Sequence, residues 1–188
     1  MDEEELRTFR TFVAGIFPNL AFEGMDRVGQ QAISETLHGR GKWPLIRSAI
    51  EGPPLQGDIV GPLPFSWIDE NGDQVEYESH GLVLSATCDV ENDDLVSVCV
   101  CIPGSTARQE DIINEEVEAQ RAFRLMFLSG GGGEFVADFA RIMTIPSRVI
   151  GDRLARSWSL TQFGYYMFLT KLTVHFMRPE AAVARSDF

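Results

Sequence analysis

Gly81-Leu82-Val83-Leu84-Ser85-Ala86-Thr87-Cys88-Asp89 passes from an unbroken apolar run directly into small residues that carry a hydroxyl, a thiol and a carboxylate. A short apolar run bounded by turn signals is typical of a buried strand. Polar groups at the exit of such a strand are held by a rigid scaffold and still reach solvent, where binding and catalytic groups often lie. We therefore expect a strand that ends near Leu84 and a candidate site that begins at Ser85.

Strand and turn patterns surround this central strand on both sides. Upstream, residues 56–60 and 64–68 are predicted strands, and Asn71-Gly72 is predicted to supply the positive φ angles of a hairpin turn. Apolar and acidic residues alternate over residues 75–78, which is the period of a half-exposed strand. Downstream, the apolar run over residues 95–102 predicts the next strand.

Helical patterns and a linker divide the chain into two parts. Apolar residues recur at helical spacing over residues 3–17 and 25–38, which predicts two helices. Glu51-Gly52-Pro53-Pro54 is the clearest linker, because glycine and proline punctuate structure. We therefore assign residues 1–52 to an N-terminal helical extension and residues 53–188 to a second domain.

The second domain contains two further predicted helices. Residues 108–128 are predicted to form one long, charged, inserted helix, and residues 159–177 a C-terminal helix. Gly130 to Gly133 are predicted to be a flexible hinge, followed by strands over residues 134–139 and 142–145. Helices, then short strands, then helix, strand and helix fit an α+β domain.

Composition narrows the class of protein. The 188 residues carry a net charge of −12, set by 28 acidic and 16 basic side chains. Such a surface repels nucleic-acid phosphates at long range, so an RNA contact needs a local basic patch. Three cysteines without a secretory signal favour a reducing cytoplasm, and no apolar run approaches the roughly 18 residues of a membrane span. We expect a cytoplasmic protein that needs no cofactor.

The order of these motifs resembles the MazF/PemK toxin family of toxin–antitoxin systems, which are small SH3-like barrels related to CcdB. The matching stretches are Gln56-Gly57-Asp58-Ile59, Val83-Leu84-Ser85, Val100 to Ile102 followed by Ser105 and Thr106, Met143-Thr144-Ile145-Pro146, and Arg153-Leu154. The resemblance implies a small SH3-like antiparallel β-barrel. It also implies a toxin-type protein of a bacterial toxin–antitoxin or phage-defence system, which acts as a metal-independent endoribonuclease on single-stranded RNA and binds an antitoxin.

One departure from the family pattern favours a second function. The family has an arginine just before the Val-Leu-Ser strand that takes part in RNA cleavage, and this chain has Ser79-His80-Gly81 there. The residues before the linker and the four glycines have no counterpart in the short toxins. The alternative is therefore a non-catalytic interaction module on the same barrel, whose acidic surface binds a protein partner.

Metal-free RNA cleavage needs a general base, an acid and a cation near the scissile phosphate. The candidate catalytic residues are His80, Asp89, Ser105 and Arg148, and the candidate substrate-binding residues are Ser85, Thr87, Thr106 and Arg153. His80 and Asp89 lie at opposite ends of one strand and meet only if it bends. Otherwise His80 is a turn histidine at the surface and Asp89 is a turn cap.

Cysteines and aromatic residues offer three more interpretations. Cys88 is a candidate reactive thiol with His80 as its base, although eight extended residues span about 26 Å; the alternative is a small buried thiol. Cys99 and Cys101 share one strand face, and with Cys88 and His80 they would make four metal ligands. The sequence lacks the paired Cys-x-x-Cys spacing of zinc sites, so we favour core cysteines and no metal. The aromatic run over residues 163–176 indicates core or the interface of a homodimer.

Overall fold

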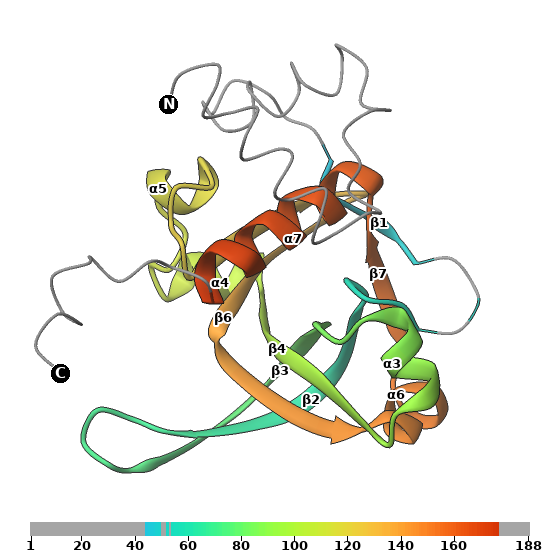
Figure 1. Ribbon diagram of the computed structural model, residues 1–188. Helices are drawn as coiled ribbons and strands as arrows, with labels where there is room; N and C mark the ends of the chain where they lie inside the picture. The colour runs from blue at the N-terminus through green and yellow to red at the C-terminus, as the bar shows by residue number, and fades with distance from the viewer. Residues whose placement is uncertain (1–43, 50–51, 53, 177–188) are drawn as a thin grey trace, which may run out of the picture. The chain divides into compact units, whose positions relative to one another are not determined.

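The computed structural model describes residues 44–49, 52 and 54–176 (Figure 1). The chain divides into two compact units, residues 1–41 and 42–188, and the described residues all belong to the second. The predicted helices over residues 3–17 and 25–38 lie outside the described residues. The second unit begins N-terminal to residue 53, where we placed the domain boundary, so the sheet includes a strand that precedes the linker.

The described residues form an α+β unit, as predicted, around one antiparallel sheet (Figure 1). In chain order the elements are β1 (Ile46–Ser48), β2 (Ile59–Ile68), β3 (Gln74–Val83), α3 (Thr87–Asn92), β4 (Leu95–Pro103), α4 (Gly104–Gln109), α5 (Glu115–Glu118), β5 (Leu125–Gly130), β6 (Gly133–Pro146), α6 (Ser147–Arg153), β7 (Arg156–Leu160) and α7 (Gln162–Phe176). The strands pair in the order β1-β7-β2-β3-β4-β6-β5, and every pair is antiparallel.

The predicted barrel is not closed by strand pairing among these residues. The two edge strands meet at one point, where the Leu45 N–H donates to the Ser129 carbonyl over 2.7 Å. The contact ends there because β1 is only three residues long and β5 turns back at Gly130. A closed barrel needs a continuous ladder between its first and last strands. The structure therefore corrects the closed barrel to an open seven-stranded sheet whose edges touch.

Both faces of the sheet are buried. Along β4, Cys99 and Cys101 pack into one apolar cluster, and Val98 and Val100 pack into another. Successive side chains of a strand point to opposite faces, so the two clusters lie on the two sides of the sheet. A strand buried on both sides is a continuous apolar run rather than an alternation, which explains the sequence of β4.

Different helices cover the two faces. Phe168 of α7 lies in the cluster that contains Cys99 and Cys101. The short helices contribute to the other cluster through Val90 of α3, Ala107 of α4, Val117 of α5 and Ile150 of α6. Helix α7 agrees with the helix predicted over residues 159–177. The longest described helix therefore lies over one face, and four short helices lie over the other.

The predicted inserted helix over residues 108–128 is wrong. Helix α4 ends at Gln109, α5 has only four residues, and the segment ends as strand β5. Asp111 and Gln120 adopt φ angles of 54° and 61°, which a right-handed helix cannot contain. The Gln120 side chain donates to the Phe127 carbonyl over 2.5 Å and fixes the return into β5. Tertiary contacts override the helical spacing of the sequence.

The four glycines form a tight turn, which corrects the predicted hinge. Gly130 pairs with Gly133, so Gly131 and Gly132 are the two residues of a hairpin loop between β5 and β6. Both have positive φ, 56° and 86°, as a type I′ turn requires. A Cβ at Gly131 would lie 3.0 Å from the Trp158 ring, so the turn also packs closely against β7.

The hairpin between β2 and β3 forms as predicted but with a different turn. Gly72 has a φ of 85°, whereas Asn71 does not have a positive φ. The carboxylate of Asp69 accepts hydrogen bonds from the Asn71 and Asp73 N–H groups at 2.8 and 2.9 Å. An Asp side chain that bonds the backbone two residues on replaces the second positive φ angle.

Strand β6 is continuous where two strands were predicted. Its pairing with β4 shifts between Cys99, which faces Ile142, and Val100, which faces Asp138. Residues 139–141 therefore bulge out of the ladder, and such a bulge bends a strand without ending it. In the part of the chain that the structure describes, no helix is both long enough and apolar enough to cross a membrane.

Candidate functional site

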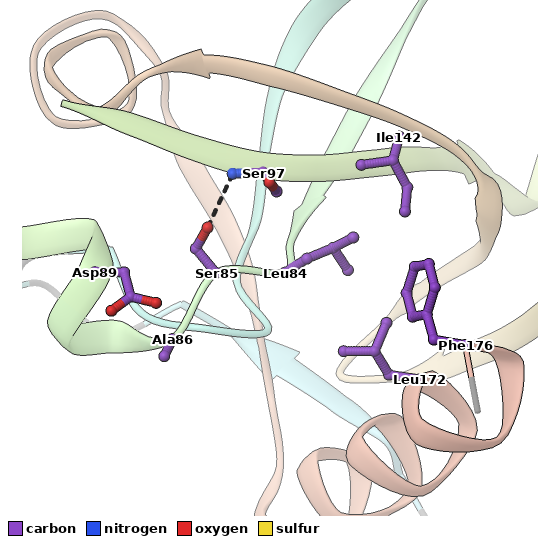
Figure 2. Close-up of a pocket in the computed structure, with 8 residues that line it drawn as sticks. All are labelled: Leu84, Ser85, Ala86, Asp89, Ser97, Ile142, Leu172 and Phe176. Carbon is purple, nitrogen blue, oxygen red and sulfur yellow. Dashed lines mark hydrogen bonds between the residues drawn. The ribbon is translucent and has the colours of Figure 1, made fainter. Parts of the chain in front are cut away.

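An open hollow of about 440 Å³ lies where the central strand ends (Figure 2). Its walls come from the exit of β3, the first turn of α3, strands β4 and β6, and the last turns of α7. The residues that line it are Leu84, Ser85, Ala86, Asp89, Ser97, Ile142, Leu172 and Phe176. Its volume is within the range of sites that bind small molecules or side chains of a partner.

One wall of the hollow is apolar and open to solvent. Phe176 is 61% exposed and Ile142 is 39% exposed, and Figure 2 shows both beside Leu172. Phe168, Leu172 and Phe176 follow one another at four-residue spacing and so share one face of α7. Phe168 is fully buried, so this apolar face runs from the core of the unit out into the hollow.

The opposite wall is polar and firmly positioned. The Ser97 N–H donates to the Ser85 hydroxyl over 2.9 Å, the bond drawn in Figure 2. The Leu84 N–H donates to the Ser97 carbonyl over 2.8 Å. These bonds continue the ladder between the two strands beyond Val83, so Ser85 is held by the backbone of β4. Asp89 follows on α3 and points its carboxylate into the same space.

Gln56 ties together the elements that form the hollow. Its side-chain amide donates to the Leu84 carbonyl over 2.7 Å, and its amide oxygen accepts from the Tyr165 hydroxyl over 2.8 Å. Its backbone N–H donates to the Thr87 hydroxyl over 3.2 Å. One residue therefore connects the exit of β3, helix α3 and helix α7. Thr87, which was predicted to bind substrate, thus has a hydroxyl that accepts a hydrogen bond from the Gln56 backbone.

An ion pair beneath this residue fixes the start of β2. The carboxylate of Asp58 is 3.0 Å from the Arg156 guanidinium and also accepts from the Leu55 N–H over 2.8 Å. Both side chains are largely buried. Gly57 has a φ of 85°, and a Cβ there would lie 2.5 Å from a methyl carbon of Leu160. The Gln-Gly-Asp-Ile motif thus positions Gln56 against the hollow.

The thiol of Cys88 is exposed and contacts Asp89. The sulfur lies 3.3 Å from Asp89 Oδ1, and this hydrogen bond together with the neighbouring negative charge raises the pKa of the thiol. A reactive cysteine needs the opposite shift, because the thiolate is the nucleophile. Nothing in this contact activates Cys88, and His80 does not reach it.

His80 lies outside the hollow, on β3 and three residues before the strand ends at Val83. It pairs with Cys101 of β4, whereas Ser85 bonds Ser97. Four residues of β4 separate these points, which is roughly 13 Å. The strand does not bend back, so the structure separates His80 from Asp89.

The surroundings of His80 are aromatic. Its ring meets the edge of Phe135 at a centroid distance of 5.4 Å, and Phe135 meets Trp158 at 6.1 Å. Burial lowers the pKa of the imidazole, so the neutral form predominates at pH 7. Its Nδ1 is buried and has no hydrogen-bond partner within the described residues. The β2 strand opposite has a register shift between Val60 and Leu63, and bulges of this kind occur next to active sites.

The remaining predicted site residues lie on other elements. Ser105 and Thr106 belong to α4, which packs over the face of the sheet opposite to the His80–Phe135 contact. Arg148 is exposed on α6, and Arg153 ends that helix. The structure brings Ser85, Thr87, Cys88 and Asp89 together, and it does not bring His80, Ser105 or Arg148 to them.

The cysteines on β4 are core residues. Cys99 and Cys101 are fully buried, and burial raises the pKa of both thiols. Cys88 lies on exposed α3, so it does not complete a site with them. Across the described ranges, no three His, Cys, Asp or Glu side chains gather in a way that could hold a metal ion.

Comparisons with known proteins assign no family to the chain. No family model matches the sequence, and no curated protein matches it. Among solved structures, the chain is similar to a chain in the Form-II crystal structure of MazE–MazF from Deinococcus radiodurans. The identity is 14%, the TM-score is 0.42, and the match covers 69% of this chain and 100% of that chain. A likeness with so low a TM-score carries no conclusion about fold, activity or partner.

Sequence reasoning placed Ser85 and Asp89 in the site but missed the apolar wall. Ile142 was assigned to a strand. The run over residues 163–176, which includes Leu172 and Phe176, was assigned to the core or to the interface of a homodimer, because its residue types are those of a core. One signal was present, since the stripe formed by Phe168, Leu172 and Phe176 continues to the end of the helix. Whether this stripe ends in the core or at the surface depends on where the sheet ends. Local sequence patterns do not determine the position of that edge.

Proposed function

We propose that this chain is a toxin-type protein of a bacterial toxin–antitoxin or defence system and that its sheet unit acts as an interaction module. The motif order resembling the MazF/PemK family supports the class. The apolar wall of the hollow supports the mode of action. In this proposal, a segment of a protein partner binds between α3 and α7 and covers Phe176 and Ile142.

The observation that carries the proposal is the concave grouping of exposed apolar side chains. Single exposed apolar residues are ordinary. Phe176 and Ile142, however, line one hollow together with Leu172 and lie opposite a fixed polar wall. Apolar surface inside a concavity with a few placed polar groups is the usual form of a binding site. Binding of a partner would remove this surface from water.

The test compares three full-length proteins as bait in extracts and in direct binding to each recovered partner. They are the wild type, the Ile142→Ser/Phe176→Ser variant, and the control Ile68→Ser, which changes a 65% exposed side chain at the end of β2. We expect one protein to bind the wild type and the control, and to bind the hollow variant at least about tenfold more weakly. Equal binding to all three, with unchanged thermal melting, would overturn the proposal.

A second candidate function is metal-independent RNA cleavage. His80 favours it, because a half-buried neutral imidazole with a lowered pKa is suited to act as a general base. The aromatic rings of Phe135 and Trp158 extend from it. Asp89 has no part in this candidate, since it lies at the hollow. RNA cleavage by this chain would therefore use His80 as the base, with an acid other than Asp89 and a cation other than Arg148.

The second candidate is tested by incubating a mixed single-stranded RNA pool with the full-length protein in EDTA. Cleavage would have to vanish in His80→Ala and persist in Asp89→Ala. Because burial lowers the pKa of His80 below the ordinary 6.5, activity would have to fall only at pH values below 6.5. No cleavage by the folded wild type would leave partner binding as the function.

A further inference from the structure

The charge of the hollow indicates the chemistry of its partner more narrowly than its apolar side chains do. Asp89 is the one charged residue among the eight that line it. Asp89 is partly buried, and its carboxylate accepts from the thiol of Cys88 and pairs with no cation among the described residues. A partly buried carboxylate that faces an apolar wall across a hollow attracts a positive group more strongly than one in open water, because the protein around it lowers the local dielectric constant.

Further acidic residues follow Asp89 in the chain, and the nearby basic residues in the sequence do not line the hollow. The exposed residues that follow Asp89 toward β4 include Glu91, Asp93 and Asp94. Lys171 precedes the lining residue Leu172 but is directed elsewhere, since its Nζ donates to the carbonyls of Ala122 and Leu125 at 2.6 and 2.7 Å. Arg148 is exposed on α6, one residue after Ser147, whose N–H bonds the Asp94 carbonyl, and it is not a lining residue.

We infer that the hollow takes an amphipathic, cationic peptide segment of a protein partner. An apolar side chain of that segment lies against Leu172, Phe176 and Ile142, and a neighbouring Lys or Arg pairs with Asp89. The net charge of −12 attracts such a segment at long range. The inference rests on the proposed function, because it specifies the chemistry of the partner that the hollow binds.

The experiment uses a display library of random nine-residue peptides panned on the full-length wild type. Counter-selection against Ile142→Ser/Phe176→Ser retains only peptides that need the hollow. We expect these peptides to carry Lys or Arg beside Leu, Ile, Phe or Met. The tightest one is then the probe in fluorescence anisotropy, next to a version in which Gln replaces each Lys and Arg.

The probe should bind Asp89→Asn about tenfold more weakly than the wild type, and the neutral peptide should lose a similar factor. The two losses should not add, because they remove the same pair. Asn keeps an oxygen that can accept from Cys88, so the fold is retained. Glu70→Gln is the matched control: it removes one exposed charge at the β2–β3 turn and should leave the Kd unchanged.

Each other outcome would overturn one part of the proposal: the cationic partner, the proposed function or the identity of the occupant. Hollow-dependent peptides without a cation, with an unchanged Kd in Asp89→Asn, would overturn the cationic partner and leave the proposed function standing. No hollow-dependent peptide at all would count against the proposed function itself. Probe binding only after a stop codon that follows Met177 would make residues 178–188 the occupant. A dimer that becomes monomeric in Ile142→Ser/Phe176→Ser would make a second copy the occupant.

Discussion

At the scale of single residues, the Asp58–Arg156 ion pair is a strong test of what positions the hollow. Asp58→Asn should lower the free energy of unfolding by about 3 kcal/mol, because it leaves a largely buried guanidinium without this carboxylate. Urea denaturation measures the change. Glu115→Gln is the control, since its pair with Arg121 is exposed and contributes less than about 1 kcal/mol. Equal effects of the two substitutions would contradict this account.

Lys171 gives a second prediction at the residue scale, in the pH dependence of stability. Burial lowers its pKa from 10.5 to about 8 in the folded state. The unfolded state therefore binds the proton more tightly, and the stability of the fold rises as pH increases from about 8 to 10.5. The wild type should gain up to about 3 kcal/mol over this window relative to Lys171→Met. Parallel pH profiles of the two proteins would refute the assignment.

Gln56 should couple stability to partner binding. Gln56→Ala removes the hydrogen bonds to Leu84 and Tyr165, and the loss of partly buried bonds costs about 1–3 kcal/mol in unfolding free energy. It also frees α3 and α7 to move apart, so the affinity for a partner of the hollow should fall. The residue touches no partner in this proposal, and Gln56→Glu should restore the bond to Tyr165 but not the bond to Leu84. Unchanged binding in Gln56→Ala would show that these hydrogen bonds of Gln56 are not needed for partner binding.

The candidate site could be predicted in part at this scale. The strand exit at Ser85 and Asp89 is visible in the sequence because an apolar run ends there. The sequence leaves the separation of His80 from Asp89 open, because the two residues are expected to meet only if the strand between them bends. Phe176 could not be assigned to the hollow, because its exposure depends on the bend of β6 and the reach of α7.

At the scale of elements, Gly164 decides how closely α7 approaches β1. A Cβ there would lie 2.0 Å from the Leu45 carbonyl oxygen. Ala in a helix is ordinarily about 1 kcal/mol more favourable than Gly, yet Gly164→Ala should destabilise the protein by more than about 2 kcal/mol, because backbone must shift. Thermal melting measures this, with Gly72→Ala as a control whose added Cβ meets nothing within 4 Å and costs only the positive φ. A rise in melting temperature in Gly164→Ala would contradict the close approach.

The helices and strands also show which parts of the fold local sequence patterns could not predict. Strands β2, β3, β4 and β6 and helix α7 follow from local periodicity and propensity, whereas β1, β5 and β7 were not predicted as strands. The segment over residues 108–128 has helical spacing, but Asp111 and Gln120 turn it through positive φ, and Gln120 bonds Phe127 across the turn. The energy of those tertiary contacts exceeds a weak local preference for helix. The tetraglycine is ambiguous between hinge and turn until its pairing partner is known.

At the scale of the whole molecule, net charge should govern association. With a charge of −12, a cationic partner is drawn in at long range, and this attraction is screened beyond about 8 Å at physiological salt. The rate constant of association should therefore fall steeply as salt rises from 50 to 500 mM, whereas the dissociation rate constant should change little. Stopped-flow fluorescence with the selected peptide measures both. An association rate that is independent of salt would argue against electrostatic attraction.

Hydrogen–deuterium exchange of the full-length protein, with and without the recovered partner, tests the central claim most directly. If the partner binds in the hollow, amides in residues 84–89 and in the last turns of α7 should exchange more slowly in the complex. The amides around His80, from Glu76 to Gly81, should be unchanged. Protection confined to the His80 region, with none at residues 84–89 or in α7, would place the site elsewhere and contradict the account.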